Sequence, residues 1–407
     1  MSGKGPLVAL AAATVASVGG TRLSVIAIPW LVLTTTGSPV LTGLMGMAEL
    51  LPYVIAKALG GPFIDRLGAR RVALWSDCLS ALAVSLVPLL FWMGLLSIWV
   101  LIPAVALIGV LRAPADAAKQ ALVPEVAALG AINLERAAGV LGASERLAGT
   151  IGAAGAGVLI ALLGTGTAML VNAAAFLASA ALIGLGLPKG RAVGGEREKS
   201  GYGAELAQGW SMLRREPVLV GLVVMIAFTN LFDQGFALVL LPVWVKAGGL
   251  DVSWVGIVLA VFSGGAIAGA AMAAAFAERL PRLPVYVAGF VCAGPTPMLV
   301  LAYQVPMPAA LAILAISGCA AGFLNPIINA ILFERIPKEM VGRVIALVGA
   351  FAWALMPFGG LYAGVLVDRF GIAAALTATA LLYLAAALSP IAIPAFRQMK
   401  RQAPAVG

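Results

Sequence analysis

The sequence predicts an all-α membrane protein with twelve transmembrane helices in two pseudo-symmetric six-helix bundles. Three observations support this class. Hydrophobic residues make up 62% of the 407 residues and charged residues 11%, and the mean hydropathy is +1.05, which no ordinary soluble domain matches. Twelve apolar stretches each reach the roughly 20 residues that a helix needs to cross a bilayer. In addition, the two halves of the chain repeat each other.

The repeat can be followed in register. The segment Ile28-Pro29-Trp30 matches Leu241-Pro242-Val243, and Gly43 matches Gly256, both at an offset of 213 residues. Repeated halves of spanning helices are typical of secondary transporters, whose substrate site lies between the repeats near the bilayer midplane. The repeat therefore favours transport before any single residue is considered.

The spans follow from the continuous apolar stretches, because strands of a membrane barrel would instead be short and alternating. Extracellular connections between them are very short and leave no room for a soluble catalytic domain. The twelve expected helices cover residues 7–35, 38–60, 72–93, 97–121, 139–163, 167–187, 218–245, 252–277, 284–304, 308–332, 341–366 and 372–394.

The longest polar interval, residues 188–217, divides the chain into an N-terminal bundle (1–187) and a C-terminal bundle (218–407). Apolar residues in the second part of this linker follow the i, i+4, i+7 spacing of a helix that lies on the cytoplasmic membrane face. These residues are Leu206, Trp210 and Leu213. A plain flexible linker is the alternative interpretation.

The net charge is +9, and its distribution gives the expected orientation. Lys and Arg gather in the segments on one side of the predicted helices, with Lys246 and Arg369 as the exceptions. This positive-inside bias predicts a protein of the bacterial inner membrane with both termini in the cytoplasm. Anionic membrane lipids are a sufficient partner for these charges, so we expect no nucleic-acid binding.

The residue inventory argues against an enzyme. The chain has no histidine, which rules out a Ser-His-Asp triad and a histidine-bearing zinc site. It has no Gly-x-x-x-x-Gly-Lys-Ser/Thr loop for ATP. The three cysteines all lie in predicted helices and indicate neither a disulfide framework nor a metal cluster. We therefore expect no metal and no cofactor.

A glycine-rich, basic loop follows the second predicted helix. It reads Gly-x-x-x-Asp-Arg-x-Gly-x-Arg-Arg, with a glycine that permits a tight turn and a basic cluster that holds the loop in the cytoplasm. Its defining residues are Gly61, Asp65, Arg66, Gly68, Arg70 and Arg71. This loop resembles the signature motif of the major facilitator superfamily. The resemblance implies that Asp65 latches the two halves when the cytoplasmic side is closed, supported by Arg66, Arg70 and Arg71.

Three further segments resemble one particular type of transporter within this superfamily. The stretches 205–217 and 336–344 and the end of the first helix, 28–33, are similar to the macrolide-efflux type of drug:proton antiporter within that superfamily. The resemblance implies the major facilitator fold and export of amphipathic or hydrophobic small molecules by proton-coupled alternating access. We also expect the chain to work as a monomer.

Charged residues at bilayer depth are rare because they are costly, and they usually pair or line a water-filled path. At about 1.5 Å per residue, Arg22 and Glu49 reach similar depths in the first two helices, so we expect them to form an ion pair. Asp233 lies at a similar depth in the seventh helix, while Arg112 and Asp116 share a face of the fourth. These five residues are the candidates for proton coupling. Structural ion pairs are the alternative.

The expected substrate cavity offers aromatic and amide side chains with few fixed charges. Its candidates are Trp30, Phe228, Asn230, Phe232, Asn325, Asn329 and Trp353. Three other functions remain open: a lipid or siderophore exporter, a proton-linked nutrient symporter and, from another class, a non-transporting membrane receptor. The fold alone does not identify a substrate.

Overall fold

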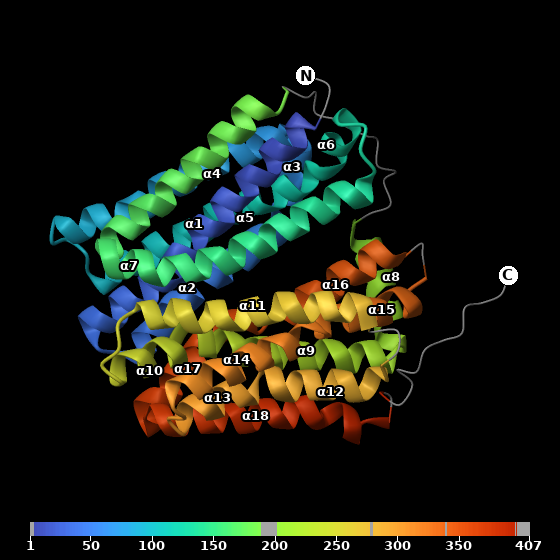
Figure 1. Ribbon diagram of the computed structural model, residues 1–407. Helices are drawn as coiled ribbons and strands as arrows, with labels where there is room; N and C mark the ends of the chain where they lie inside the picture. Colours follow the sequence, from blue (N-terminus) through green and yellow to red (C-terminus); the bar gives the residue numbers. More distant parts are fainter. Residues whose placement is uncertain (1–3, 189–201, 277–279, 338–339, 395, 397–407) are drawn as a thin grey trace. The chain divides into compact units, whose positions relative to one another are not determined.

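The computed structural model describes residues 4–188, 202–276, 280–337, 340–394 and 396, and all regular secondary structure in them is helical (Figure 1). The first part of the predicted linker, residues 189–201, lies outside the described residues. The helices of the first half are α1 (Gly5–Thr36), α2 (Pro39–Leu59), α3 (Gly61–Leu67), α4 (Ala69–Trp92), α5 (Ile98–Ala121), α6 (Val123–Leu129) and α7 (Leu134–Gly186).

The second half begins with a short helix before its membrane spans, and one of its spans contains a π-helical turn, η1. Its helices are α8 (Tyr202–Arg215), α9 (Pro217–Gly235), η1 (Phe236–Leu240), α10 (Leu241–Ala247), α11 (Ser253–Phe276), α12 (Arg282–Ala293), α13 (Pro295–Ala302), α14 (Met307–Gly322), α15 (Leu324–Arg335), α16 (Val341–Trp353), α17 (Met356–Phe370) and α18 (Ile372–Ala392).

Eleven helical runs among the described residues are long and apolar enough to cross a membrane. One of them, Arg136–Gly186, contains a break at Gly164, whose φ of 76° and ψ of 161° are not helical. Glycine tolerates this positive φ because it has no Cβ. With the break counted, the eleven runs become twelve segments, and the predicted helical class and number are confirmed.

Local sequence signals set the helix ends where the spans turn. α1 ends at Gly37, whose left-handed backbone (φ 70°) lets its N–H donate to the Leu33 carbonyl. α2 begins directly afterwards, because the Ser38 side chain accepts the N–H of Leu41 and Pro39 occupies the first helical position. A tight connection therefore joins the first two spans, as the sequence predicts.

By their spatial contacts the residues form two compact units. The first contains Met1–Glu196 and Val245–Ala260, and the second contains Arg197–Trp244 and Val261–Gly407. In the first unit α1 packs along α7, and α5 packs against α2 and α4. Figure 1 shows α1 and α7 running alongside each other in this unit.

Small residues bring the helices close in both units, as expected where van der Waals packing replaces the hydrophobic effect. In the first unit, a Cβ at Gly20 of α1 would lie 2.6 Å from the Asn172 side-chain oxygen of α7. In the second unit, a Cβ at Gly359 of α17 would lie 2.2 Å from the Leu231 carbonyl oxygen of α9. The glycines therefore determine which helices can touch backbone to backbone.

The described part of the linker, α8, is a helix as the spacing of its apolar residues predicts. It packs within the second unit: Leu213 is buried, and the Trp210 ring lies 5.3 Å from the Phe351 ring of α16. Arg343 also donates a hydrogen bond to Gln208 at 3.1 Å. α8 is thus docked on α16, which argues against a plain flexible linker for this stretch.

Candidate functional site

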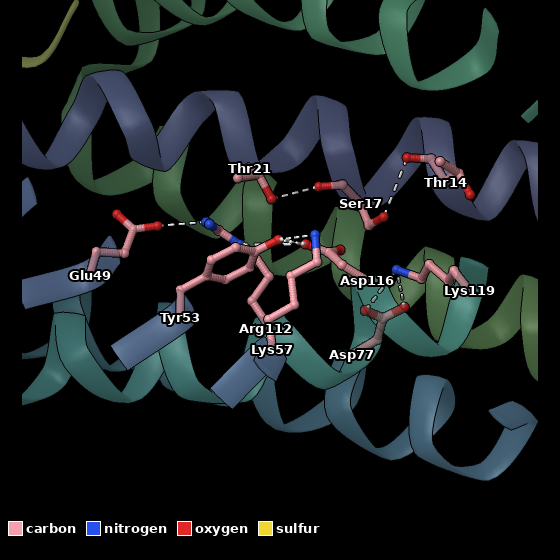
Figure 2. Close-up of polar contacts among 10 residues, drawn as sticks. All are labelled: Thr14, Ser17, Thr21, Glu49, Tyr53, Lys57, Asp77, Arg112, Asp116 and Lys119. Carbon is pink, nitrogen blue, oxygen red and sulfur yellow. Dashed lines mark hydrogen bonds and ion pairs between the residues drawn. The ribbon is translucent and has the colours of Figure 1, made fainter. Parts of the chain in front are cut away.

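The first unit holds a buried ion pair at mid-depth of its helices. Glu49 lies near the middle of α2, and Arg112 lies on α5. The Arg112 Nη1 donates to Glu49 Oε1 at 2.5 Å, and each residue is only 7% exposed (Figure 2). The guanidinium carbon also lies 4.5 Å from the centre of the Tyr53 ring, within cation–π range. Glu49 and Arg112 therefore form the most deeply buried charged pair among the predicted coupling residues.

A glycine one turn from Arg112 makes this pair possible. A Cβ at Gly109 would lie 2.2 Å from the backbone carbonyl oxygen of Glu49 and 3.4 Å from the Tyr53 nitrogen. Because α5 carries no side chain at this position, the backbones of α2 and α5 meet at the level of Glu49. The short distance between the backbones lets the Arg112 side chain reach the carboxylate.

We expect Gly109→Ala to lower the free energy of unfolding by about 1–3 kcal/mol, because the added methyl forces the two backbones apart. It should also weaken gradient-driven transport, since the Glu49–Arg112 distance grows. Equilibrium unfolding in mixed micelles and flux in proteoliposomes measure the two effects. Gly155→Ala in α7, where a Cβ meets nothing within 4 Å, is the matched control. Equal stability of the two variants would contradict the proposed crowding.

Asp116 adds a second carboxylate to the Glu49–Arg112 pair. It lies one turn after Arg112 on α5, and its Oδ2 is 3.9 Å from the Arg112 Nε, as the i, i+4 spacing predicts. The Tyr53 hydroxyl donates to the same Oδ2 at 3.0 Å, and the Lys57 ammonium donates to that hydroxyl at 3.5 Å. Arg112 is therefore shared between two acids, one buried and one partly exposed. Tyr53 completes the cluster, although sequence reasoning did not include it.

The prediction of an Arg22–Glu49 ion pair is wrong, because Glu49 pairs with Arg112 instead. Arg22 is exposed on α1, and its side chain lies against α7. A Cβ at Gly149 would be 3.3 Å from an Arg22 guanidinium nitrogen, and one at Gly152 would be 3.1 Å from the Arg22 Cγ. The depth of Arg22 was predictable, but the direction of its side chain depends on how α1 packs on α7.

A second buried cluster lies beside the first (Figure 2). The Lys119 ammonium is 2.9 Å and 3.0 Å from the two carboxylate oxygens of Asp77, and the Ser179 hydroxyl donates to that carboxylate at 2.6 Å. Asp77 and Ser179 are fully buried, and Lys119 is 3% exposed. These residues join α4, α5 and α7. Their complete burial and mutual pairing indicate a structural role.

The residues of the glycine-rich loop have separate surroundings. Gly68 turns the chain between α3 and α4 with a φ of 86°, as the motif predicts. The Arg70 guanidinium donates to the carbonyls of Gly184 and Leu187 at 2.5 and 3.0 Å, so it caps the C-terminal end of α7. Asp65 is exposed on α3. Three other residues of the motif are also exposed: Gly61, Arg66 and Arg71.

The predicted cavity residues differ in burial: one is buried, two are partly buried and four are exposed. Phe232 is 5% exposed, with its ring 5.7 Å from that of Tyr362 and 6.0 Å from that of Tyr383, and its place in a cavity wall stays a prediction. Asn230 is partly buried and donates to the Ala352 carbonyl at 2.9 Å. Of the other candidates, Trp30 is partly buried and four are exposed: Phe228, Asn325, Asn329 and Trp353.

Asp233 lies on α9, directly before the π-helical turn η1. Asp233 is exposed as a whole residue, and its carboxylate accepts a hydrogen bond from the Tyr383 hydroxyl of α18 at 3.3 Å. π-helical turns inside longer helices occur frequently at functional sites. The depth of Asp233 was predictable from the sequence, whereas its contact with Tyr383 and the π-helical turn were not.

The cluster in the first unit can change its pairing when it binds a proton. A proton on Glu49 removes the charge that attracts Arg112, and Asp116, on the same helix, is then the remaining acid close to the guanidinium. Alternating between two acids is a route by which a buried site exchanges a proton without leaving a charge unpaired. The geometry therefore fits coupling between protonation and a rearrangement of α2 relative to α5.

The chain is similar in sequence to known multidrug efflux pumps. The chain is 31% identical to the multidrug efflux pump Tap of Mycobacterium tuberculosis, over 98% of this chain and 96% of that protein. It is 30% identical to the Tap pump of Mycolicibacterium fortuitum, over 97% of both chains.

Solved structures share the fold at low sequence identity. The nucleoside transporter NupG matches with a TM-score of 0.75 and 12% identity over 98% of this chain and all of that chain. A bacterial homologue of the human lysosomal transporter Spinster, in an inward-facing unoccupied conformation, matches with a TM-score of 0.71 and 13% identity over 98% of both chains.

The family model described as Major Facilitator Superfamily matches this chain twice, over residues 10–252 and 223–406. The two matches correspond to the internal repeat that the sequence predicts. The chain therefore belongs to the Major Facilitator Superfamily, as its loop motif predicts, and it is a multi-pass membrane transporter, not an enzyme.

Proposed function

We propose that this chain exports amphipathic or hydrophobic small molecules in exchange for protons. The observation that carries the proposal is the buried Glu49–Arg112 pair with Asp116 as a second acid for the same guanidinium. The names of the mycobacterial relatives, multidrug efflux pumps, support both the outward direction and the substrate class.

In this mechanism Glu49 is the proton-binding group. When Glu49 is ionised, Arg112 holds α2 against α5, and Gly109 allows the two backbones to touch. Protonation of Glu49 releases Arg112 toward Asp116, and the weakened contact between α2 and α5 favours the alternative conformation. A proton then drives the cycle because it binds the two conformations with different affinities.

The other predicted residues complete the proposal. The loop motif of Asp65, Arg66, Arg70 and Arg71 serves as a cytoplasmic gate, and the exposed aromatic and amide residues line the substrate path. The distribution of Lys and Arg supports a bacterial inner-membrane protein with both termini in the cytoplasm and anionic lipids as neighbours. We propose that the chain works as a monomer of two bundles.

Glu49→Gln tests the coupling. In proteoliposomes with ethidium as the transported probe, the wild type should move ethidium against its gradient when a pH gradient is imposed. The variant should lose at least about tenfold of this flux, because Gln cannot exchange a proton. Movement of ethidium down its own gradient should persist, since the substrate path is intact.

Asp368→Asn is the matched control, because it neutralises an exposed carboxylate at the end of α17. It should retain the flux of the wild type. Gradient-driven flux that is unchanged by Glu49→Gln would remove Glu49 from the coupling role. Ethidium movement with the proton gradient, instead of against it, would make the chain a symporter.

A further inference from the structure

Lys246 is one of the two basic residues that fall outside the positive-inside pattern of the sequence. It lies in the last turn of α10, at the end of the candidate membrane span Pro217–Ala247. A basic residue at this end opposes the bias that orients membrane proteins, so it needs a separate explanation. By its contacts Lys246 belongs to the first unit, as part of the segment Val245–Ala260.

The partner of Lys246 is the end of α1. Its ammonium donates to the backbone carbonyl of Leu33 at 2.5 Å, and the same carbonyl accepts the Gly37 N–H that ends the helix. Carbonyls in the last turn of a helix carry a partial negative charge, which a lysine compensates. In the described part of the chain, no carboxylate oxygen lies within the 4.0 Å of an ion pair from this ammonium. The Leu33 carbonyl is therefore the acceptor that holds Lys246.

The last turn of α1 takes its other side-chain donors from within the helix. Each of its three final residues is a threonine whose hydroxyl donates to a carbonyl of the preceding turn, as Thr36 does to Val32 at 2.7 Å. Leu33 receives a lysine from 213 positions away instead. This separation equals the offset of the sequence repeat, so the contact joins equivalent positions in the first span of each half. Because local donors and Gly37 complete the helix end, the Lys246 contact can break without unwinding α1.

Apolar and glycine contacts hold the rest of the segment Val245–Ala260. A Cβ at Gly157 of α7 would lie 2.9 Å from the Gly256 nitrogen of α11, so the two backbones touch. Val252 and Val255 are 3% and 1% exposed. Within a bilayer such contacts exchange for lipid contacts at little cost, because lipid tails are equally apolar. The Lys246 hydrogen bond is, in contrast, a directional contact that lipid tails cannot replace.

We propose that Lys246 is a releasable latch that holds the segment Val245–Ala260 on the end of α1 and opens during each transport cycle. This inference rests on the proposed function, because an exported molecule leaves on this side of the membrane only if this end of the bundle opens. Lysine suits such a latch, since its flexible stem lets the ammonium move from the carbonyl to water. The latch therefore favours the conformation in which this end is closed.

Hydrogen–deuterium exchange of the full-length protein in nanodiscs tests the latch. Lys246→Met should speed amide exchange in residues 31–37 and 245–256 at least about tenfold, because a hydrogen bond from a charged donor is lost. Lys246→Arg keeps a charged donor and should stay within about threefold of the wild type. Arg369→Gln is the matched control, since it removes the other basic residue outside the positive-inside pattern, and this residue is exposed. It should leave both peptides unchanged.

A glycine pair tests the same segment independently of charge. Gly157→Ala places a methyl 2.9 Å from the Gly256 nitrogen, so it should also speed exchange in residues 245–256. Gly155→Ala, where a Cβ meets nothing within 4 Å, should not. Exchange in residues 73–80, around the buried Asp77, should stay at the wild-type rate in all these variants, which shows that the fold is intact.

Transport distinguishes a latch from a static cap. Lys246→Met should raise the movement of ethidium down its own gradient about two- to threefold, because opening no longer breaks this hydrogen bond. A static cap would leave that flux unchanged.

Three results would overturn the assignment: exchange at 245–256 that Lys246→Met does not change, ethidium movement that it does not raise, or faster exchange at 73–80 as well. The last result would make Lys246 a structural residue. If the wild type shows no gradient-driven export but Lys246→Met still speeds exchange only at 31–37 and 245–256, the export proposal fails and the latch contact stands.

Discussion

Arg112→Met should lower the free energy of unfolding by about 3–5 kcal/mol and abolish gradient-driven export. The substitution leaves the Glu49 carboxylate buried at 7% exposure without its partner at 2.5 Å. Removing one member of a buried ion pair destabilises the fold by far more than the intact pair stabilises it. The reason is that an uncompensated charge stays in a medium of low dielectric constant. Equilibrium unfolding in mixed micelles gives the stability, and proteoliposome flux gives the transport.

The double substitution Glu49→Leu with Arg112→Met separates structure from coupling. Replacing both members of a buried pair by apolar residues is often neutral or stabilising, so the double variant should regain most of the lost stability. It should still fail to couple protons, since neither charged group is present. Full stability of Arg112→Met alone would show that Glu49 has another partner. Restored export in the double variant would exclude the pair from coupling.

Lys119→Met should cost a similar 3–5 kcal/mol for the same reason, since Asp77 is fully buried and loses the ammonium at 2.9 Å. In contrast to the Arg112 variant, it should leave flux per folded molecule close to that of the wild type. The Asp77 cluster has every charge paired and its carboxylate is inaccessible. Thermal unfolding and flux normalised to folded protein measure the two quantities.

Ser179→Ala provides a graded control for this second cluster. It removes the hydroxyl that lies 2.6 Å from Asp77 but leaves the ion pair, so the loss should be about 1–3 kcal/mol. A loss equal to that of Lys119→Met would mean that the ion pair contributes nothing of its own. Flux per folded molecule that falls in both variants would include Asp77 in the coupling machinery.

Much of the organisation was predictable because bilayer thickness restricts the sequence so strongly. Twelve apolar stretches, the turn at Gly37 and the break at Gly164 all follow from hydropathy and glycine conformation. The turn at Gly68 follows from the loop motif. The i, i+4 relation of Arg112 and Asp116 is local to one helix, so it was predictable as well. The repeat in the sequence also agrees with the two matches to the family model.

The partners of the charged side chains were not predictable in the same way. Sequence gives the depth of a residue along its helix, but it does not give the rotation of that helix or its neighbours. By its depth Arg22 was the expected partner of Glu49, but the structure pairs Glu49 with Arg112. The contact at Gly109 brings α5 to α2, whereas Gly149 and Gly152 accept Arg22 on α7.

The sequence by itself therefore determined the class of the protein, the number of its spans and the depth of its charges. Those properties depend on hydrophobicity and on local backbone preferences, which act over a few residues. Only the tertiary structure decided that Glu49 pairs with Arg112, that Phe232 is buried and that Tyr383 contacts Asp233. Each of those contacts joins different helices, and close packing of small residues, which no single helix specifies, selects it.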